Sequence, residues 1–220
     1  MSLNNKINKI RDIVACNKVV PAVTVIAVTK TLNLAQTEEA INAGLINLGE
    51  NRLQSALPKI EALVSKYPDI VWHFLGPIQK NKAKKIVDNF SYIHSIDSWE
   101  VLESINDYAG ELKKQPAVLL QINVSNETSK HGFEPEFLLN TISRLQDFSN
   151  VRFEGYMTMA PFTQDKNVLH KVFSGLKIMA EKIKERGIEY KNLSMGMSND
   201  YIIALKEGAS MLRLGTILFS

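Results

Sequence analysis

Short apolar runs alternate along the chain with longer segments in which apolar residues recur every three or four positions. A nearly continuous apolar run of this length is typical of a strand buried on both faces, as in a parallel sheet. The first run, VTVIAVTK, is rich in β-branched residues and ends in Lys30 before a polar turn. We therefore predict strands over 23–30, 45–50, 71–76, 92–97, 117–124, 153–159, 192–198 and 211–216.

The intervening segments have the spacing of amphipathic helices. Pro58 either kinks the helix over 53–64 or marks its start, and Asp97 followed by Glu100 resembles a capping box. We expect Leu34 and Ile41 to face inward, and no helix to follow the last strand. The helices are predicted over 3–16, 32–44, 53–64, 78–87, 97–112, 138–145 and 168–183, with a short one ending at Gly208.

Strands and helices alternate without a linker or a shift in composition, which favours an all-parallel sheet in an α/β fold. Eight such units are the number that closes a (β/α)8 barrel of the TIM type, and a doubly wound open sheet is the alternative. Because one helix precedes the first strand and none is expected after the last, we expect the amino-terminal helix to complete the outer ring. Residues 1–220 are thus expected to form a single domain.

Composition and charge narrow the compartment and the partners. Of 220 residues, 45% are hydrophobic and 22% are charged, and the net charge of +3 is too small to argue for nucleic acid by itself. Cys16 is the single cysteine, so no disulfide forms within the chain, and MSLNNKINKI lacks the apolar core of a signal peptide. No apolar run approaches the length of a membrane span. We expect a cytoplasmic protein without membrane contact, and a monomer.

The carboxyl ends of the strands in such a barrel face one shared site. Lys30 lies at the first of these ends, where a partly desolvated lysine is a nucleophile toward aldehydes; a lysine that merely begins a solvated loop is the alternative. Ser198 after the seventh run, and Gly215 and Thr216 after the eighth, offer hydroxyls and backbone N–H groups where these barrels usually hold phosphate. A capping serine and a turn glycine would explain two of these residues without a ligand.

Arg213 lies two residues before Gly215, so it points to the same side of the eighth strand. A buried arginine needs an acceptor, which could be a structural ion pair or the ring nitrogen of a heteroaromatic ligand. An aldehyde-reactive lysine, a phosphate cradle and an arginine aimed at a ring nitrogen together describe a pyridoxal 5′-phosphate (PLP) site.

Several longer motifs follow one another along nearly the whole chain. They are AVTK at 27–30, GEN at 49–51, WHFLGPIQKNK at 72–82, HSID at 94–97, QINVSNETSKHG at 121–132, GYMTM at 155–159, LSMGMSND at 193–200 and LRLGT at 212–216. In this order they resemble the PLP homeostasis protein family, also called the proline synthetase co-transcribed homologues. The resemblance implies a single-domain fold-type III barrel like the amino-terminal domain of alanine racemase.

The resemblance also implies roles for individual residues. Lys30 looks like the lysine that forms a Schiff base with PLP, Asn51 like an asparagine near the cofactor ring, and Arg213 like the arginine facing the pyridine nitrogen. Leu32 stands where relatives commonly have a second lysine, which puts a transfer role of that position in doubt. The phosphate contacts match Ser198, Gly215 and Thr216, and further motif positions near the pocket match His73, Met197 and Lys130.

Family members are thought to bind and carry PLP and to keep the free cofactor in check, with no established enzymatic reaction. Apo PLP-dependent enzymes are the implied recipients. The alternative is a weakly active, racemase-like PLP enzyme. Arg213 keeps its proton, so it would leave the ring nitrogen unprotonated and the electron sink weak. Racemases tolerate this arrangement, but alanine racemases draw a catalytic tyrosine from a carboxyl-terminal β-domain. We expect no such domain here, and therefore no committed turnover and no catalytic residue.

Other classes of function find less support in the residues. The run QKNKAKK at 79–85 lacks interleaved aromatic residues, which favours a solvated face over nucleic-acid binding. The histidines at 73, 94, 131 and 170 have no paired metal-ligand spacing, so we expect no metal site. Trp72 and Trp99 are expected to be anchors of the core or of an interface.

Overall fold

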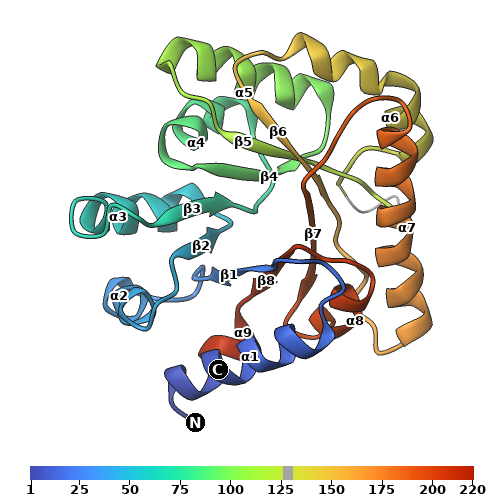
Figure 1. Ribbon diagram of the computed structural model, residues 1–220. Helices are drawn as coiled ribbons and strands as arrows, with labels where there is room; N and C mark the ends of the chain where they lie inside the picture. Colours follow the sequence, from blue (N-terminus) through green and yellow to red (C-terminus); the bar gives the residue numbers. More distant parts are fainter. Residues whose placement is uncertain (126–130) are drawn as a thin grey trace.

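A closed barrel forms the centre of the molecule in the computed structural model, which describes residues 1–125 and 131–220 (Figure 1). Each parallel strand pairs with its neighbour in chain order, and β8 pairs back with β1. This last pairing excludes the open sheet and confirms the predicted (β/α)8 barrel. The strands are β1 (Thr24–Val28), β2 (Asn47–Glu50), β3 (Val71–Phe74), β4 (Tyr92–Ile96), β5 (Ala117–Gln121), β6 (Arg152–Met157), β7 (Asn192–Met197) and β8 (Met211–Leu214).

Helices surround the strands as an outer layer (Figure 1). None of the helices within 1–125 and 131–220 is long and apolar enough to cross a membrane. The helices are α1 (Leu3–Asn17), α2 (Leu34–Asn42), α3 (Leu53–Leu63), α4 (Ala83–Asn89), α5 (Trp99–Leu112), α6 (Pro135–Thr141), α7 (Lys166–Lys184), α8 (Tyr201–Lys206) and α9 (Thr216–Phe219), with 3-10 turns η1 (Lys80–Lys82) and η2 (Ile142–Asp147).

The amino-terminal helix closes the outer ring as predicted. α1 packs against α8 and α9, and its buried residues are Ile7, Ile10 and Val14. The expectation that no helix follows the last strand is wrong, because α9 begins immediately after Gly215. With four residues, α9 spans only about 6 Å at the helical rise per residue, so it leaves the eighth place in the ring to α1.

Three local expectations about helices also need correction. Ser98, not Asp97, is the N-cap of α5, and its hydroxyl accepts a hydrogen bond from the N–H of Val101. Asp97 instead lies just after β4, with its carboxylate 3.2 Å from a ring nitrogen of His131. Leu34 is 43% exposed because it is the first residue of α2, at the rim of the barrel. Pro58 lies inside α3, so it does not mark the start of that helix.

Side chains alternate along the strands between the helical layer and the barrel interior. Trp72 and Trp99 lie in the layer between strands and helices, 4% and 2% exposed, as the core anchors that were expected. The interior has a mixed character. Its apolar part is the cluster of Ile26, Leu119, Met157 and Met211, and its buried polar part includes His73, His94, Ser194 and Arg213.

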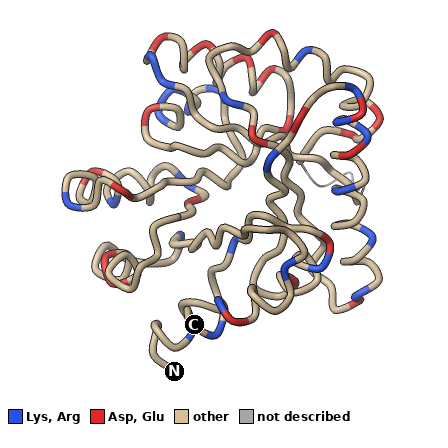
Figure 2. The backbone as a smooth tube through the Cα atoms, in the orientation of Figure 1, with Lys and Arg blue, Asp and Glu red and all other residues tan. Residues whose placement is uncertain are grey.

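Charged residues of both signs are interspersed around the outside of the barrel (Figure 2). The basic run at 79–85 lies on η1 and the first turn of α4, where Lys84 pairs with the exposed carboxylate of Glu111. Nearby, Lys114 pairs with Asp88 at 2.6 Å. These contacts agree with a solvated, charge-paired face.

Two glycines with a positive φ differ in how closely other atoms approach them. Gly155 (φ +142°) and Gly187 (φ +86°) both have a positive φ, but a Cβ at Gly155 would lie 2.0 Å from the carbonyl oxygen of Asn192, whereas one at Gly187 would meet nothing within 4 Å. We expect Gly187→Ala to lower the free energy of unfolding by about 1–2 kcal/mol. Gly155→Ala should cost about 1–3 kcal/mol more because backbone must move. Urea unfolding measures both; equal losses would contradict the prediction.

Candidate functional site

A cavity of about 560 Å³ opens at the carboxyl ends of the strands, where the sequence placed the site. It brings together all of the predicted binding residues except His73; Lys130 lies outside the described residues. The predicted residues that line it are Lys30, Asn51, Met197, Ser198, Arg213, Gly215 and Thr216, and Leu32, Gln36, Leu75, Met159 and Asn199 are among their neighbours.

Lys30 sits in the turn that follows β1, and its side chain is exposed. The N–H of Leu32 donates to the carbonyl of Thr29 at 2.9 Å and closes this turn. The N–H of Thr29 donates to the carbonyl of Gly49 at 2.9 Å, which ties the turn to β2. The backbone of Lys30 is therefore held by its neighbours, and the residue lines the cavity.

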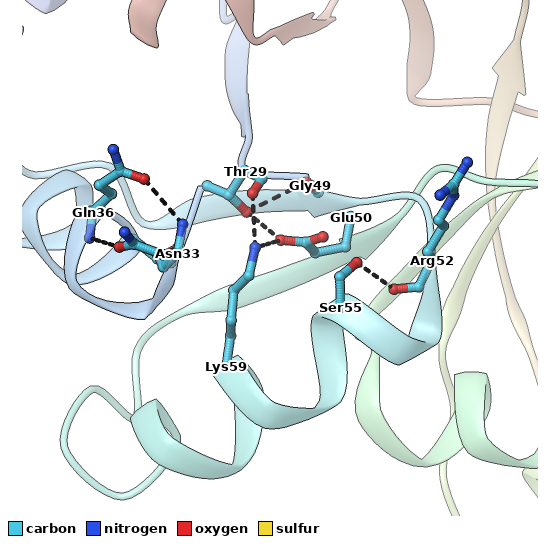
Figure 3. Close-up of polar contacts among 9 residues, drawn as sticks. Thr29, Asn33, Gln36, Gly49, Glu50, Arg52, Ser55 and Lys59 are labelled. Carbon is cyan, nitrogen blue, oxygen red and sulfur yellow. Dashed lines mark hydrogen bonds and ion pairs between the residues drawn. The ribbon is translucent and has the colours of Figure 1, made fainter. Parts of the chain in front are cut away.

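A buried charge cluster supports this turn from the side of α3 (Figure 3). Lys59 donates from its Nζ both to the backbone carbonyl of Thr29 and to Glu50 Oε1, at 2.7 Å each. The hydroxyl of Thr29 donates to the same carboxylate oxygen at 2.6 Å. Glu50 is 0% and Lys59 is 6% exposed, so the two charges compensate each other away from water. The cluster anchors the residue that precedes Lys30.

Asn51 follows β2 immediately and is held by a close approach of two loops. A Cβ on Gly76 would lie 2.0 Å from the backbone oxygen of Asn51, so only glycine lets the chain after β3 pass here. The carbonyl of Gly76 in turn accepts a hydrogen bond of 2.5 Å from the hydroxyl of Ser95.

Ser198 links the ends of β7 and β8. Its Oγ accepts hydrogen bonds from the backbone N–H groups of Gly215, at 3.3 Å, and Ile217, at 3.2 Å. The alternative in which Ser198 caps the helix after β7 is wrong, because Asp200 occupies the N-cap of α8 without a side-chain cap bond. Backbone N–H groups and a hydroxyl therefore gather at one wall of the cavity, an arrangement that suits an anion.

Arg213 enters the cavity wall from inside the barrel and is 5% exposed. Its Nη1 donates to Ser194 Oγ at 2.7 Å, and its Nη2 donates to the carbonyl of Thr158 at 2.9 Å. Both acceptors are neutral oxygens, so neither contact is the structural ion pair that the sequence left open for Arg213. Burial lowers the pKa of Arg213 to about 10, and the charge of Asp200 opposes that shift. The guanidinium is thus still protonated at neutral pH.

His73 lies deeper than expected, in the barrel interior below the cavity. Its Nδ1 is 3.0 Å from His94 Nε2, and its Nε2 is 3.1 Å from Asn47 Oδ1. It faces inward because β3 places alternate residues inside, and Leu75, two positions further along, reaches the cavity instead. Burial lowers the pKa of His73 to about 3 and that of His94 well below its usual value.

Sequence reasoning missed Gln36 and the interior partners of Arg213. Gln36 lies three residues after Asn33, and the two form a capping box at the start of α2, which is a readable local signal. His94 and Ser194 stand inside the motifs HSID and LSMGMSND, but nothing in those motifs tells which strands meet across a barrel. Among the described residues there is no group of three His, Cys, Asp or Glu side chains suited to a metal ion.

Comparisons with known proteins define first the class of barrel. The sequence model of the family described as "Alanine racemase, N-terminal domain" matches residues 3–220. An alanine racemase from Clostridium difficile is 17% identical and superposes with a TM-score of 0.82 over 99% of this chain and 56% of that chain, a likeness of fold alone.

Relatives with a higher sequence identity to this chain identify the family within this class of barrel. A protein from Synechocystis named pyridoxal phosphate homeostasis protein is 43% identical over 200 residues, 90% of this chain and 91% of that protein. The structure of PipY from Synechococcus elongatus without PLP is 34% identical with a TM-score of 0.92, and that with PLP bound is 33% identical with a TM-score of 0.90; both cover 100% of each chain. The chain belongs to the pyridoxal phosphate homeostasis protein family.

The buried pair beneath Lys30 is expected to stabilise the fold. Lys59→Met leaves the carboxylate of Glu50 buried without its partner, which typically costs about 3–5 kcal/mol of unfolding free energy. The double variant Glu50→Gln/Lys59→Met, which leaves no charge behind, should recover part of this loss in urea unfolding. Lys66→Met, at the exposed Lys66–Glu38 pair, is the control and should change little. A loss no larger than the control's would refute this role of the pair.

The buried histidines predict an acid-sensitive fold. Below pH 6.5 the unfolded chain binds a proton at His73 that the folded protein does not bind until about pH 3, so stability falls as the pH falls through this window. Each such histidine contributes a slope of up to about 1.4 kcal/mol per pH unit. Urea unfolding between pH 6.0 and 5.0 should show a smaller slope for His73→Asn than for the wild type or for His170→Asn. An unchanged slope in His73→Asn would count against a neutral, buried His73.

Proposed function

We propose that the chain binds PLP in this cavity, holds it as a Schiff base on Lys30, and serves as a carrier and buffer in cytoplasmic PLP homeostasis. PLP supplies an aldehyde that condenses with an amine, with loss of water. The observation that carries the proposal is the composition of one cavity wall. Lys30 is the lysine among its described lining residues, and it shares the cavity with Arg213 and the N–H groups bound to Ser198.

The residues present fit the chemical parts of the cofactor. The hydroxyls and backbone N–H groups at Ser198, Gly215 and Thr216 suit a phosphate, and the N–H groups of Gly215 and Ile217 already converge on one oxygen atom, Ser198 Oγ. The Arg213 guanidinium, a permanent donor, suits an unprotonated ring nitrogen. Asn51 is proposed beside the ring, and Met197, which is 37% exposed, as an apolar wall.

A carrier is favoured over an enzyme by the surroundings of Lys30 and Arg213. Lys30 is exposed at the cavity mouth, where a bound group can leave as well as enter. Protonated Arg213 would not give a proton to the ring, and this keeps the electron sink weak. The second candidate is a weak racemase-like activity, favoured by the shared fold with alanine racemase. Recipient apo-enzymes and a monomeric state stay predictions of this proposal, as does the single domain over 1–220.

The proposal predicts a covalent adduct at one lysine. Added PLP should give the purified protein an imine absorption band near ~420 nm, and borohydride followed by peptide mapping should place the label on Lys30. Lys30→Ala should lose both signals, whereas Lys85→Ala, at an exposed lysine of α4, should keep them. No band, or label spread over surface lysines, would remove the cofactor from the proposal.

A second measurement separates carrier from enzyme. PLP-loaded protein mixed with an apo-aminotransferase should restore the activity of that enzyme, while amino-acid racemisation by the loaded protein itself stays at background. Rapid racemisation that disappears in Lys30→Ala would favour the second candidate instead.

A further inference from the structure

A chain of polar side chains crosses the inside of the barrel behind the cavity. It starts at Arg213 on β8, which donates to Ser194 Oγ on β7 at 2.7 Å. Ser194 Oγ is 2.9 Å from His94 Nδ1 on β4, and His94 Nε2 is 3.0 Å from His73 Nδ1 on β3. The chain ends where His73 Nε2 meets Asn47 Oδ1 on β2 at 3.1 Å. Ser194 and both histidines are 0% exposed.

The chemistry of these side chains determines which group donates in each hydrogen bond of the series. A guanidinium only donates, so Ser194 Oγ accepts from Arg213 and its own proton needs another acceptor. Among the described residues, His94 Nδ1 is the hydrogen-bond partner left for that proton. His94 therefore carries its proton on Nε2 and donates to His73 Nδ1. His73 then donates from Nε2 to Asn47 Oδ1, which is an acceptor, so both ends of the chain agree.

The two imidazoles are neutral, and Arg213 carries the charge. Burial lowers the pKa of both rings, and the nearby Arg213 charge adds to the effect at His94. Tyr92 stacks on His73 with ring centroids 4.8 Å apart, which holds that ring in its plane. A neutral imidazole with one acceptor nitrogen is what the Ser194 proton requires, since an imidazolium would have none.

We propose that His94 is a positioning residue for the cavity: its Nδ1 accepts a hydrogen bond from the Ser194 hydroxyl, which fixes the orientation in which Ser194 accepts from Arg213 and so orients the guanidinium toward the ligand. Without this acceptor the buried hydroxyl proton of Ser194 would have no partner among the described residues, and the hydroxyl would no longer be fixed in the orientation in which it accepts from Arg213. The part of the inference that concerns a ligand rests on the proposed binding of PLP. The tautomers do not rest on it.

The tautomers are measurable in the protein without any cofactor. Ring ¹⁵N shifts in NMR spectra should show His94 and His73 as neutral Nε2–H tautomers from pH 8 to pH 5. His131 and His170, which are not part of this hydrogen-bonded series of side chains, serve as internal comparisons. An Nδ1–H tautomer at His94, or its protonation above pH 5, would overturn the inference whether or not PLP binds.

A matched pair of variants tests the positioning role. Asn is short enough to offer Oδ1 near the place of the imidazole Nδ1, so His94→Asn keeps an acceptor for Ser194. Gln reaches toward the place of Nε2, so His94→Gln keeps the contact with His73 and takes the acceptor from Ser194. Loss of a hydrogen bond to a charged group corresponds to about a tenfold or greater change in Kd. We therefore expect PLP to bind about tenfold or more weakly to His94→Gln and Ser194→Ala, with a displaced absorption band. His94→Asn should lose less than this, and His170→Gln should match the wild type.

The outcomes separate this inference from the proposed function. Equal weakening in His94→Asn and His94→Gln would reduce His94 to a packing residue, and PLP would still be bound by Lys30. If the wild type bound no PLP, the proposed function would fail, and the ¹⁵N spectra would still decide which group donates in each of these hydrogen bonds. If a variant failed to fold, the wild-type spectra would decide it as well.

Discussion

The buried guanidinium of Arg213 constrains the whole interior of this barrel. A charge at 5% exposure is tolerated only where acceptors meet it, and those acceptors come from β7 and from the residue after β6. The buried Ser194 hydroxyl proton is in turn accepted by His94, and the proton on His94 Nε2 is accepted by His73. A single positive charge therefore explains why polar side chains occupy places that branched apolar residues commonly fill in barrels of this type.

Lys30, the second basic residue of the cavity, is held in place by a different set of contacts. Lys30 itself is exposed, but the residue before it is tied to a buried ion pair that spans β2 and α3. The backbone at Lys30 is thus fixed by the contacts of its neighbours, while its side chain is exposed. Arg213 is thus fixed by its side-chain contacts, whereas Lys30, after the neighbouring strand β1, is fixed through its backbone.

Much of the fold and most of the site could be predicted because they depend on local pattern and on one topological rule. Apolar runs located the strands, and the carboxyl ends of parallel strands located Lys30, Ser198 and Gly215 together. Contacts between distant segments could not be predicted. Ser98 rather than Asp97 caps α5, and His73 points inside, because strand ends and barrel closure decide these places. The single turn α9 was missed because four residues carry no periodicity.

The polar interior also bears on how the barrel closes. In the observed register Arg213 of β8 lies opposite Ile26 of β1 and Met197 of β7. Side chains alternate along a strand, so a slip of one residue would turn Arg213 outward among apolar helices and bring Leu212 or Leu214 inside. Ser194 and His94 would then be left facing hydrocarbon. The polar side chains of the interior thus penalise a one-residue slip of β8, which gives the folding chain an internal check on the pairing of its last strand.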